Sequence, residues 1–362
     1  MFEIFNKWYR RYLQEEESIV LLVLLVAGLA MLLTVGDILT PLFAAIVLAY
    51  LVQGVANLMM RLGLPQSLGF ALAFLVFVGS FFGVLLGLLP LVWRQLVGLT
   101  GELPRMLEGG REMLAVLPNE YPQLFNQEQI NQVIAAAQVE IASYGQRMVT
   151  RTLAGIPGFI TFIIYLVLIP IMVFFFLKDR SQVVRWISSF LPSRRPLLTR
   201  IWEEMNQQFA NYARGKVVEI IIVGAVSFAA FTWLNLAYAA LLALMVGVSV
   251  IIPYIGALLV TIPILVVALF QWGLSSEFYS VLGVYVMIQI LDGNVLVPLL
   301  FSEAVNLHPV AIIVAVLFFG GIWGIWGVFF AIPLATLIKA VINAWPTRLD
   351  ETAADASVPH GE

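Results

Sequence analysis

Eight long apolar segments, separated by polar stretches, limit the folds that this chain can adopt. They fall at about residues 18–36, 38–58, 68–93, 155–177, 217–236, 240–270, 279–300 and 309–345. About 20 apolar residues are enough for one helix to cross a bilayer. Inside lipid, the backbone polar groups must be satisfied within such a helix. We therefore expect an all-α polytopic membrane protein with about eight transmembrane segments, some of them broken or re-entrant.

The composition agrees with this class and argues against several others. Of the 362 residues, 61% are hydrophobic and 11% are charged, whereas soluble domains hold about 45–50% apolar and about 25% charged residues. Cysteine is absent and only two histidines occur. Disulfides and thiolate metal sites are therefore excluded, and we expect no metal and no cofactor. The net charge of −3 is small, which argues against a nucleic-acid partner.

Sequence patterns of common enzymes are missing as well. The chain has no H-E-x-x-H and no G-x-S-x-G motif, which would indicate a metalloprotease or a serine hydrolase. A phosphate-binding P-loop is also absent. We therefore expect no enzymatic activity and no ATP hydrolysis by this chain.

The apolar segments and the charge distribution divide the chain into six predicted parts. These are an N-terminal cytoplasmic segment with three transmembrane helices (1–93), an amphipathic helical extracytoplasmic segment (94–154), a fourth transmembrane helix (155–177), a basic cytoplasmic helical loop (178–216), a C-terminal transmembrane region with broken helices (217–345) and a disordered cytoplasmic tail (346–362). Most of the 19 Lys and Arg residues lie in the parts assigned to the cytoplasm. The positive-inside rule then places both termini in the cytoplasm.

The two largest polar parts have helical patterns of their own. Apolar residues recur at helical spacing from Ile130 to Met148, which predicts an amphipathic helix. This helix would cover the outer face of the protein, form a subunit contact or lie on the membrane surface, and the pattern leaves these alternatives open. The basic loop is predicted to form two short helices that are separated at Pro192–Pro196.

Asp292 is the single charge in the seventh apolar segment and the leading candidate for a functional residue. A charge at membrane depth costs about 2.5–3.5 kcal/mol, and such residues usually mark a path for an ion or substrate. Gln289 and Asn294 are polar neighbours, while Gly293 and Pro298 are expected to open the helix. Asp292 is therefore predicted either to couple protonation to transport or to hydrogen-bond a neighbouring helix for structural reasons.

Two apolar segments are too long for one straight crossing. Segment 240–270 carries the sequence Pro253-Tyr254-Ile255-Gly256 near its middle, and segment 309–345 contains the pair Gly320-Gly321 and Pro333. We expect broken helices, strong kinks or re-entrant hairpins at these positions. Because discontinuous helices expose backbone carbonyls and helix ends, Pro253, Tyr254 and Gly256 are candidate residues of a transport site.

Two further groups complete the candidate pathway. Glu303, Asn306 and His308 lie in a short predicted outer loop after the Asp292 segment. Arg214, Lys216 and Glu219 lie at the predicted cytoplasmic entry of the fifth crossing. Lys216 and Glu219 are three residues apart, so they can pair on one face of a helix. Each group therefore has a local structural interpretation beside the functional one.

Seven short motifs together resemble the autoinducer-2 exporter family of bacterial permeases. They are FFFLKDR at 174–180, NYARGK at 211–216, PYIG at 253–256, DGNVLVP at 292–298, NLHP at 306–309, FGG at 319–321 and IPLA at 332–335. The resemblance extends from about residue 5 to residue 346. Ala257 follows PYIG where many members carry proline, a departure that weakens the expected break.

The resemblance implies a homo-oligomeric inner-membrane protein of about eight helices without ATP-binding subunits. Members of the family are tied to export of a small signalling molecule, and some of them to sodium/proton antiport. We therefore expect a secondary transporter for a small solute or ion, coupled to protons or sodium, with a site around Asp292, Pro253 and Gly293. The alternative is a non-transporting oligomeric scaffold in which Asp292 is a structural hydrogen-bonding residue.

Overall fold

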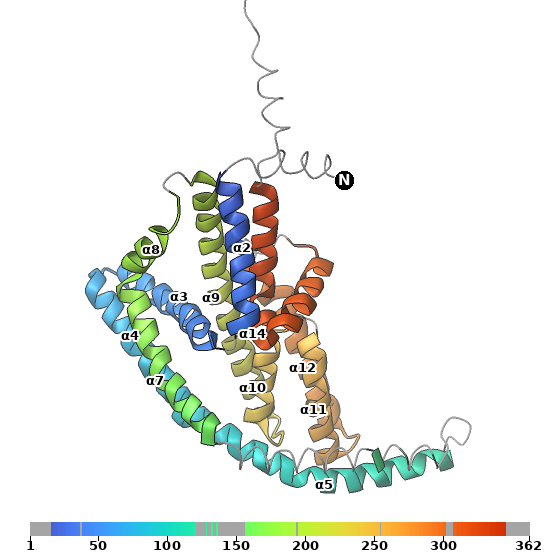
Figure 1. Cartoon of the computed structure of the whole chain (residues 1–362). Helices are drawn as coiled ribbons and strands as arrows, with labels where there is room; N and C mark the ends of the chain where they lie inside the picture. The colour runs from blue at the N-terminus through green and yellow to red at the C-terminus, as the bar shows by residue number, and fades with distance from the viewer. Residues whose placement is uncertain are drawn as a thin grey trace, which may run out of the picture. The chain divides into compact units, whose positions relative to one another are not determined.

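The chain folds into α-helices and short π-helical turns in all the regular elements described here (Figure 1). This computed structural model describes residues 16–36, 38–120, 128, 132, 135–136, 156–192, 195–253, 255–301 and 307–344. Seven helical stretches in these residues are long and apolar enough to cross a membrane, and two shorter apolar helices cover Ile19–Val35 and Ala239–Ser249. The predicted all-α polytopic fold is therefore confirmed.

The N-terminal half consists of long helices with few interruptions. Its elements are α2 (Glu16–Val35), α3 (Thr40–Arg61), α4 (Gln66–Gly83), the π-helical turn η1 (Val84–Leu88), α5 (Leu89–Glu120) and α7 (Ile156–Lys178). The elements α4, η1 and α5 follow one another without a gap, so the helix continues past residue 93. The predicted amphipathic stretch from Ile130 to Met148 lies almost wholly outside the described residues, and the predicted tail 346–362 lies outside them too.

The basic loop forms one short helix and the start of a very long one. Helix α8 (Arg180–Ser188) is short as expected, and the chain separates it from α9 near Pro192. Helix α9 runs from Pro196 to Trp233, so the prediction of a second short helix was wrong. After Pro196, which favours a helix start, no proline interrupts the chain before Trp233. The fifth apolar segment therefore simply continues this helix.

The remaining elements show how the two overlong apolar segments are interrupted. They are α10 (Ala239–Ser249), α11 (Ile255–Trp272), α12 (Ser276–Leu291), the π-helical turn η2 (Asp292–Leu296), α13 (Val297–Phe301) and α14 (Pro309–Ala344). Segment 240–270 breaks between α10 and α11, around Pro253 as predicted.

Helix α14 is also interrupted, but not at the predicted residues. Its backbone leaves the helical conformation at Trp323 (φ −131°, ψ 17°) and Gly324 (φ 59°, ψ −138°). The expectation of a break at Gly320-Gly321 or Pro333 was therefore wrong, because helix continues through these positions. The positive φ of Gly324 favours glycine, since a Cβ is strained in that conformation.

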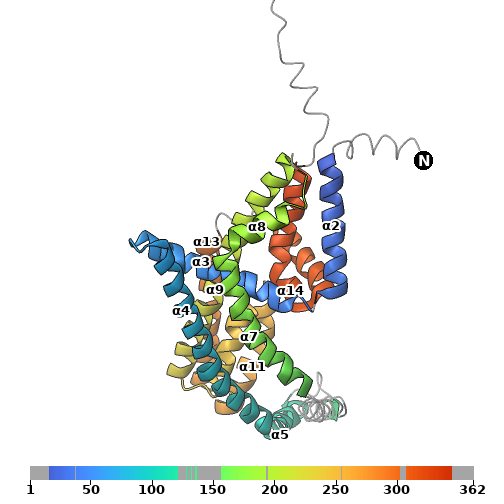
Figure 2. The ribbon, with the colours of Figure 1, turned by 60° about the vertical axis from the view of Figure 1, so that its left-hand side comes forward.

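The described residues divide into two compact units. Unit 1 lies within Met1–Gly54, Met172–Gly215 and Phe301–Glu362, and unit 2 lies within Val55–Ile171 and Lys216–Leu300. In unit 1, α2, α14 and the first part of α9 run side by side (Figures 1 and 2). Leu21, Leu198 and Val341 pack together there. The Glu17 carboxylate accepts a hydrogen bond from Leu197 N at 3.0 Å and so satisfies a donor at the start of α9.

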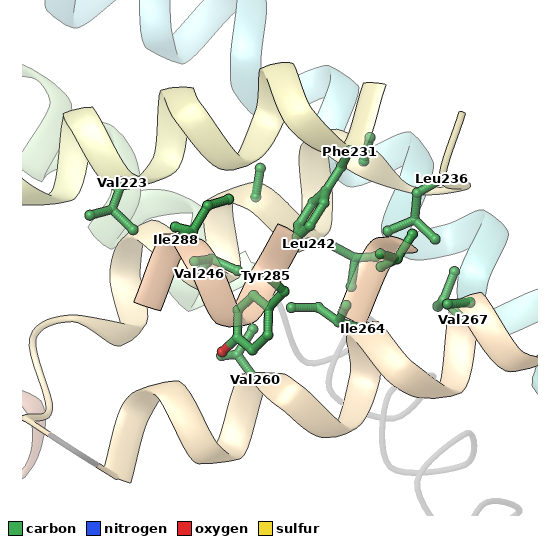
Figure 3. Packing of buried hydrophobic residues seen from close by; sticks show 14 of the residues in the cluster. Val223, Phe231, Leu236, Leu242, Val246, Val260, Ile264, Val267, Tyr285 and Ile288 are labelled. Carbon is green, nitrogen blue, oxygen red and sulfur yellow. The ribbon is translucent and has the colours of Figure 1, made fainter. Parts of the chain in front are cut away.

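The main apolar core of unit 2 is formed by α9, α10, α11 and α12. Figure 3 shows Phe231 of α9, Leu242 of α10, Ile264 of α11 and Tyr285 of α12 within one buried cluster. Helix α5 also packs against α10, where Gln95 Oε1 accepts a hydrogen bond from Leu241 N at 2.8 Å. This contact satisfies a backbone donor in the first turn of α10.

Candidate functional site

A buried ion pair on α9 is the starting point of the candidate site. Lys216 Nζ lies 2.6 Å from Glu219 Oε2, and the two side chains are only 5% and 2% exposed. Their spacing of three residues places them on one face of α9, as predicted. A buried charge is costly unless it is paired and hydrogen-bonded. The pair therefore places two charged groups inside a mainly apolar bundle.

Lys216 also binds the end of the neighbouring helix α10. Its Nζ donates a hydrogen bond to Val250 O at 3.0 Å, directly after α10 ends at Ser249. The last carbonyls of a helix have no partner within it, and a cation at this end is favoured by the helix dipole. Lys216 therefore connects the ion pair to the interruption between α10 and α11.

Two glycines allow α9 and α10 to approach closely. A Cβ on Gly247 would lie 2.9 Å from Ile220 O and 3.1 Å from the Cα of Gly224. Such small residues let the backbones of membrane helices come together. This close crossing brings the Lys216 ammonium group within reach of Val250.

The interruption between α10 and α11 is a tight backbone reversal. Gly256 N donates to Ile252 O at 2.9 Å, and Ile252 N donates to Ser249 O at 3.0 Å. A Cβ on Gly256 would collide with the Ser249 carbonyl. The break predicted at Pro253 is thus confirmed, although alanine rather than proline follows Gly256. Tyr254 lies outside the described residues.

Asp292 lies in a continuous helix, so the predicted break at Gly293 was wrong. The segment Asp292–Leu296 is π-helical and joins α12 to α13. Val297 N donates to Asp292 O, and Asn294 Nδ2 donates to Ile290 O at 2.9 Å. An open backbone in lipid costs several kcal/mol for each unsatisfied group. The shifted hydrogen bonds avoid this cost and accommodate Pro298, which has no N–H to donate.

The Asp292 carboxyl group joins the buried pair electrostatically. It lies close enough to Lys216 and to Glu219 for their charges to interact. Asp292 Oδ1 is buried without a hydrogen-bond partner, and Gln289 Nε2, one turn earlier, is also buried without one. We refer to Lys216, Glu219 and Asp292 as the charged cluster. When all three groups are ionised, it holds two negative charges and one positive charge.

A second polar group lies on α11 and α12, and sequence reasoning missed it. Tyr285 Oη donates to Ala257 O at 2.7 Å, and Thr261 Oγ1 donates to the same carbonyl at 2.8 Å. Two hydroxyl groups therefore hold the first turn of α11. The Tyr and Thr residues are visible in the sequence, but their shared acceptor follows only from the packing of α11 against α12.

The other predicted site residues have local partners or belong elsewhere. Arg214 Nε donates to Tyr50 O at 3.3 Å in unit 1. His308 is exposed, and its Nδ1 accepts a hydrogen bond from Val310 N at 3.3 Å near the start of α14. Gly293 and Pro298 are exposed on η2 and α13. Glu303 and Asn306 lie outside the described residues.

No group of three or more acidic or histidine residues in the described part of the chain could hold a metal ion. The charged cluster itself offers two carboxyl groups and one ammonium group. These three groups are ionisable, and none of them is a nucleophile placed beside a base. Ionisable groups at membrane depth are of the kind that mark an ion or substrate path.

These features define a multi-pass membrane protein of the transport type, and comparison with known proteins agrees. The family model described as AI-2E family transporter matches residues 19–347. "Putative permease PerM" of Escherichia coli (strain K12) is 47% identical over 346 residues, which cover 96% of this chain and 98% of the relative. "Putative transport protein YueF" of Bacillus subtilis (strain 168) is 26% identical and covers 83% of this chain and 82% of its own length. The chain belongs to the AI-2E transporter family.

Proposed function

We propose that the chain is a secondary permease that moves a small solute or ion across the bacterial inner membrane, coupled to a proton or a sodium ion. Membership of a transporter family and the names of its relatives support the transport part. The charged cluster supports the coupling part, because two carboxyl groups share one ammonium group inside an apolar bundle.

The coupling ion is assigned to Asp292. Glu219 has Lys216 as its close partner, whereas Asp292 Oδ1 has no hydrogen-bond partner and its negative charge exceeds what Lys216 balances. An ionisable group in this setting gains by taking up a proton or a cation. Gln289 lies one turn away and would help to position the bound ion.

The cluster is also placed to transmit ion binding to the backbone. Lys216 interacts with Asp292 and holds the carbonyl of Val250 at the end of α10. Binding or release of the ion at Asp292 changes the charge next to Lys216. This in turn changes the strength of the hydrogen bond from Lys216 Nζ to Val250 O. Discontinuous helices such as the α10–α11 pair are where many transporters form their substrate sites. The solute site of the proposal therefore lies at this interruption.

Reconstituted protein tests the proposal directly. Liposomes that contain a pH-sensitive dye and the purified protein are given an inward sodium gradient. Wild type should drive protons outward as sodium enters. Asp292→Asn keeps the size of the side chain but removes its charge, so it should lose most of this response. The matched control is Glu277→Gln, because Glu277 is an exposed acid at the start of α12.

Two outcomes would contradict parts of the proposal. If Asp292→Asn moves protons as fast as wild type with the same pH dependence, Asp292 has no coupling role. If this variant instead loses thermal stability or changes its oligomer size while its flux persists, Asp292 is a structural residue and not the coupling group. If wild type moves neither ion, the coupling assignment is wrong, and flux of small furanose-like solutes then decides whether the chain is a permease.

The proposal also includes a homo-oligomer with both termini in the cytoplasm. Since the chain has no cysteine, one cysteine placed near either terminus can be labelled without background. A membrane-impermeant maleimide should label it only in lysed cells or inverted vesicles. Labelling in intact spheroplasts would overturn the topology, and a monomeric mass in light scattering would overturn the oligomer.

A further inference from the structure

Helix α8 exposes an apolar face that nothing in the described chain covers. Val183, which is half-buried, Trp186 and Ile187 lie at the spacing of one helix face, and Phe190 follows in the turn just after α8 ends at Ser188. Trp186 is 66% exposed, Ile187 is 50% exposed and Phe190 is 73% exposed, and the Trp186 and Phe190 rings lie edge to face at 5.2 Å. At nine residues α8 is far too short to cross a bilayer. Its apolar side chains therefore cannot be surrounded by lipid in the way that those of a membrane-spanning helix are, and they need another kind of cover.

The position of α8 indicates what this cover is. The membrane-spanning helix α7 ends at Lys178, and α8 begins only two residues later at Arg180 (Figure 1). A short connection of this kind holds α8 near the level at which α7 leaves the apolar layer. Arg195 Nη1 donates to Ser188 O at 2.6 Å and so satisfies the last turn of α8.

The charges around α8 are mainly positive. Lys178 lies over the Phe174 ring at 5.6 Å, and Arg180 Nη2 donates to Asn206 Oδ1 at 3.4 Å. Arg185 is exposed on the polar side of α8, and Asp179 is the one acidic residue between Lys178 and Phe190. Short helices with aromatic residues on one face and basic residues on the other lie in the interface of a membrane.

We propose that residues 178–190 form a docking surface for anionic lipid headgroups, with the apolar face of α8 at the boundary of the acyl chains. Lys178 and Arg185 contact the phosphates, while Trp186, Ile187 and Phe190 enter the outer part of the apolar layer. A second copy of this chain fits the surface less well. A symmetric contact would bring the same basic residues of both copies together. This assignment is independent of the proposed coupling at Asp292.

Single cysteines in the cysteine-free chain test the apolar part of this proposal. Ile187→Cys reports on the exposed apolar face, and Ser181→Cys, also exposed, reports on the polar side of the same helix. Each variant carries a polarity-sensitive fluorophore in the full-length protein in nanodiscs. Lipids brominated on the acyl chain should quench the label at position 187 strongly and the label at position 181 weakly. Equal and weak quenching at both positions would overturn the proposal.

A second comparison tests the preference for anionic headgroups. At a fixed mole fraction, brominated phosphatidylglycerol should quench position 187 more than brominated phosphatidylcholine does. Lys178→Gln combined with Arg185→Gln should reduce this preference by about fivefold for each charge removed. Arg105→Gln, on the exposed part of α5, is the matched control and should leave it unchanged.

Each remaining outcome counts against the anionic surface. Equal quenching by the two lipids would show an interfacial helix without headgroup recognition. Shielding of position 187 that depends on protein concentration rather than on lipid would show that a second copy covers α8. Either result would overturn the assignment of anionic headgroups as the occupant.

Discussion

The interruption between α10 and α11 and the one inside α14 use the same backbone device in different surroundings. In the first, Gly256 leaves room for the Ser249 carbonyl, and in the second Gly327 leaves room for the Phe319 carbonyl. In both places a longer side chain would collide with backbone. Each long apolar segment therefore turns back where one glycine allows two helix ends to touch.

The side chains around the two interruptions differ in kind. Charged and hydroxyl groups hold the α10–α11 interruption, through Lys216 at Val250 O and Tyr285 at Ala257 O. Aromatic rings surround the α14 interruption, where Trp323 stacks on Phe330 at 5.7 Å and meets the edge of Phe43 at 4.6 Å. A reversal inside a membrane protein can thus be stabilised without charge. The charges at α10–α11 therefore call for a functional explanation, and the α14 interruption serves as its structural reference.

Of the substitutions that test this comparison, replacement of Lys216 should cause the largest loss of stability. Lys216→Met leaves Glu219 buried without a counter-charge, which should lower the free energy of unfolding by about 3–5 kcal/mol. Unfolding in a mixed detergent series measures this loss. The double variant Lys216→Met/Glu219→Gln should recover a large part of it. If the double variant is no more stable than the single one, the loss in Lys216→Met does not come from an unpaired buried charge on Glu219.

Replacement of the glycines at the two interruptions should cause the next largest loss of stability, and the loss should be equal at the two sites. Gly256→Ala and Gly327→Ala each force a methyl group against a carbonyl, which should lower the free energy of unfolding by about 1–3 kcal/mol. Gly283→Ala on α12 is the control, because a Cβ there meets nothing within 4 Å. It should be neutral or stabilising by up to about 1 kcal/mol. A wild-type melting temperature for Gly256→Ala would contradict the tight reversal.

Substitution of two tyrosines distinguishes an effect on stability from an effect on transport, with a smaller loss of stability than the glycine variants. Tyr285→Phe removes the hydrogen bond to Ala257 O in unit 2, and Tyr212→Phe removes one of 2.9 Å to Phe329 O in unit 1. Each should cost about 1 kcal/mol, as for other buried hydrogen bonds. Only Tyr285→Phe should also change the flux or its ion dependence. If Tyr212→Phe changes them equally, the two interruptions do not divide function as proposed.

Trp323→Phe should have the smallest effect. Trp323 Nε1 is buried without a hydrogen-bond partner, so phenylalanine removes an unsatisfied donor while keeping an aromatic ring. The lost contact area and the relief of the buried donor should nearly cancel, leaving a change below about 1 kcal/mol. Ion-driven flux should stay at the wild-type level. A large loss of flux would give the α14 interruption a functional role.

Local patterns in the sequence predicted the parts of the fold that depend on neighbouring residues. The long apolar segments, the break at Pro253 and the pairing of Lys216 with Glu219 all follow from spacing along one stretch of chain. The position of the α14 interruption did not, because Gly320, Gly321 and Gly324 can all adopt positive φ. The interruption falls at Gly324, where the neighbouring Trp323 ring packs against Phe43 and Phe43 packs against Phe330.

The candidate site shows the same division between local and distant information. Asp292 is visible in the sequence as a charge in an apolar segment. Its link to Lys216 is not visible, since the two residues lie 76 positions apart. Val250 O as the acceptor for Lys216 depends on the close crossing at Gly224 and Gly247. The predicted break at Gly293 was wrong because neighbouring hydrogen bonds were not visible in the sequence. A glycine weakens a helix locally, yet hydrogen bonds shifted by one residue keep it continuous.

The central claim is that Asp292 in the charged cluster binds the coupling ion, a proton or a sodium ion. Proton release on addition of sodium tests it most directly, because the two ions would compete for this carboxyl group. The purified protein in weakly buffered detergent solution is titrated with sodium chloride while a pH indicator is followed, and choline chloride corrects for ionic strength. Wild type and Glu277→Gln should release protons in proportion to protein, and Asp292→Asn should release none. Release from Asp292→Asn equal to that of wild type would contradict the account.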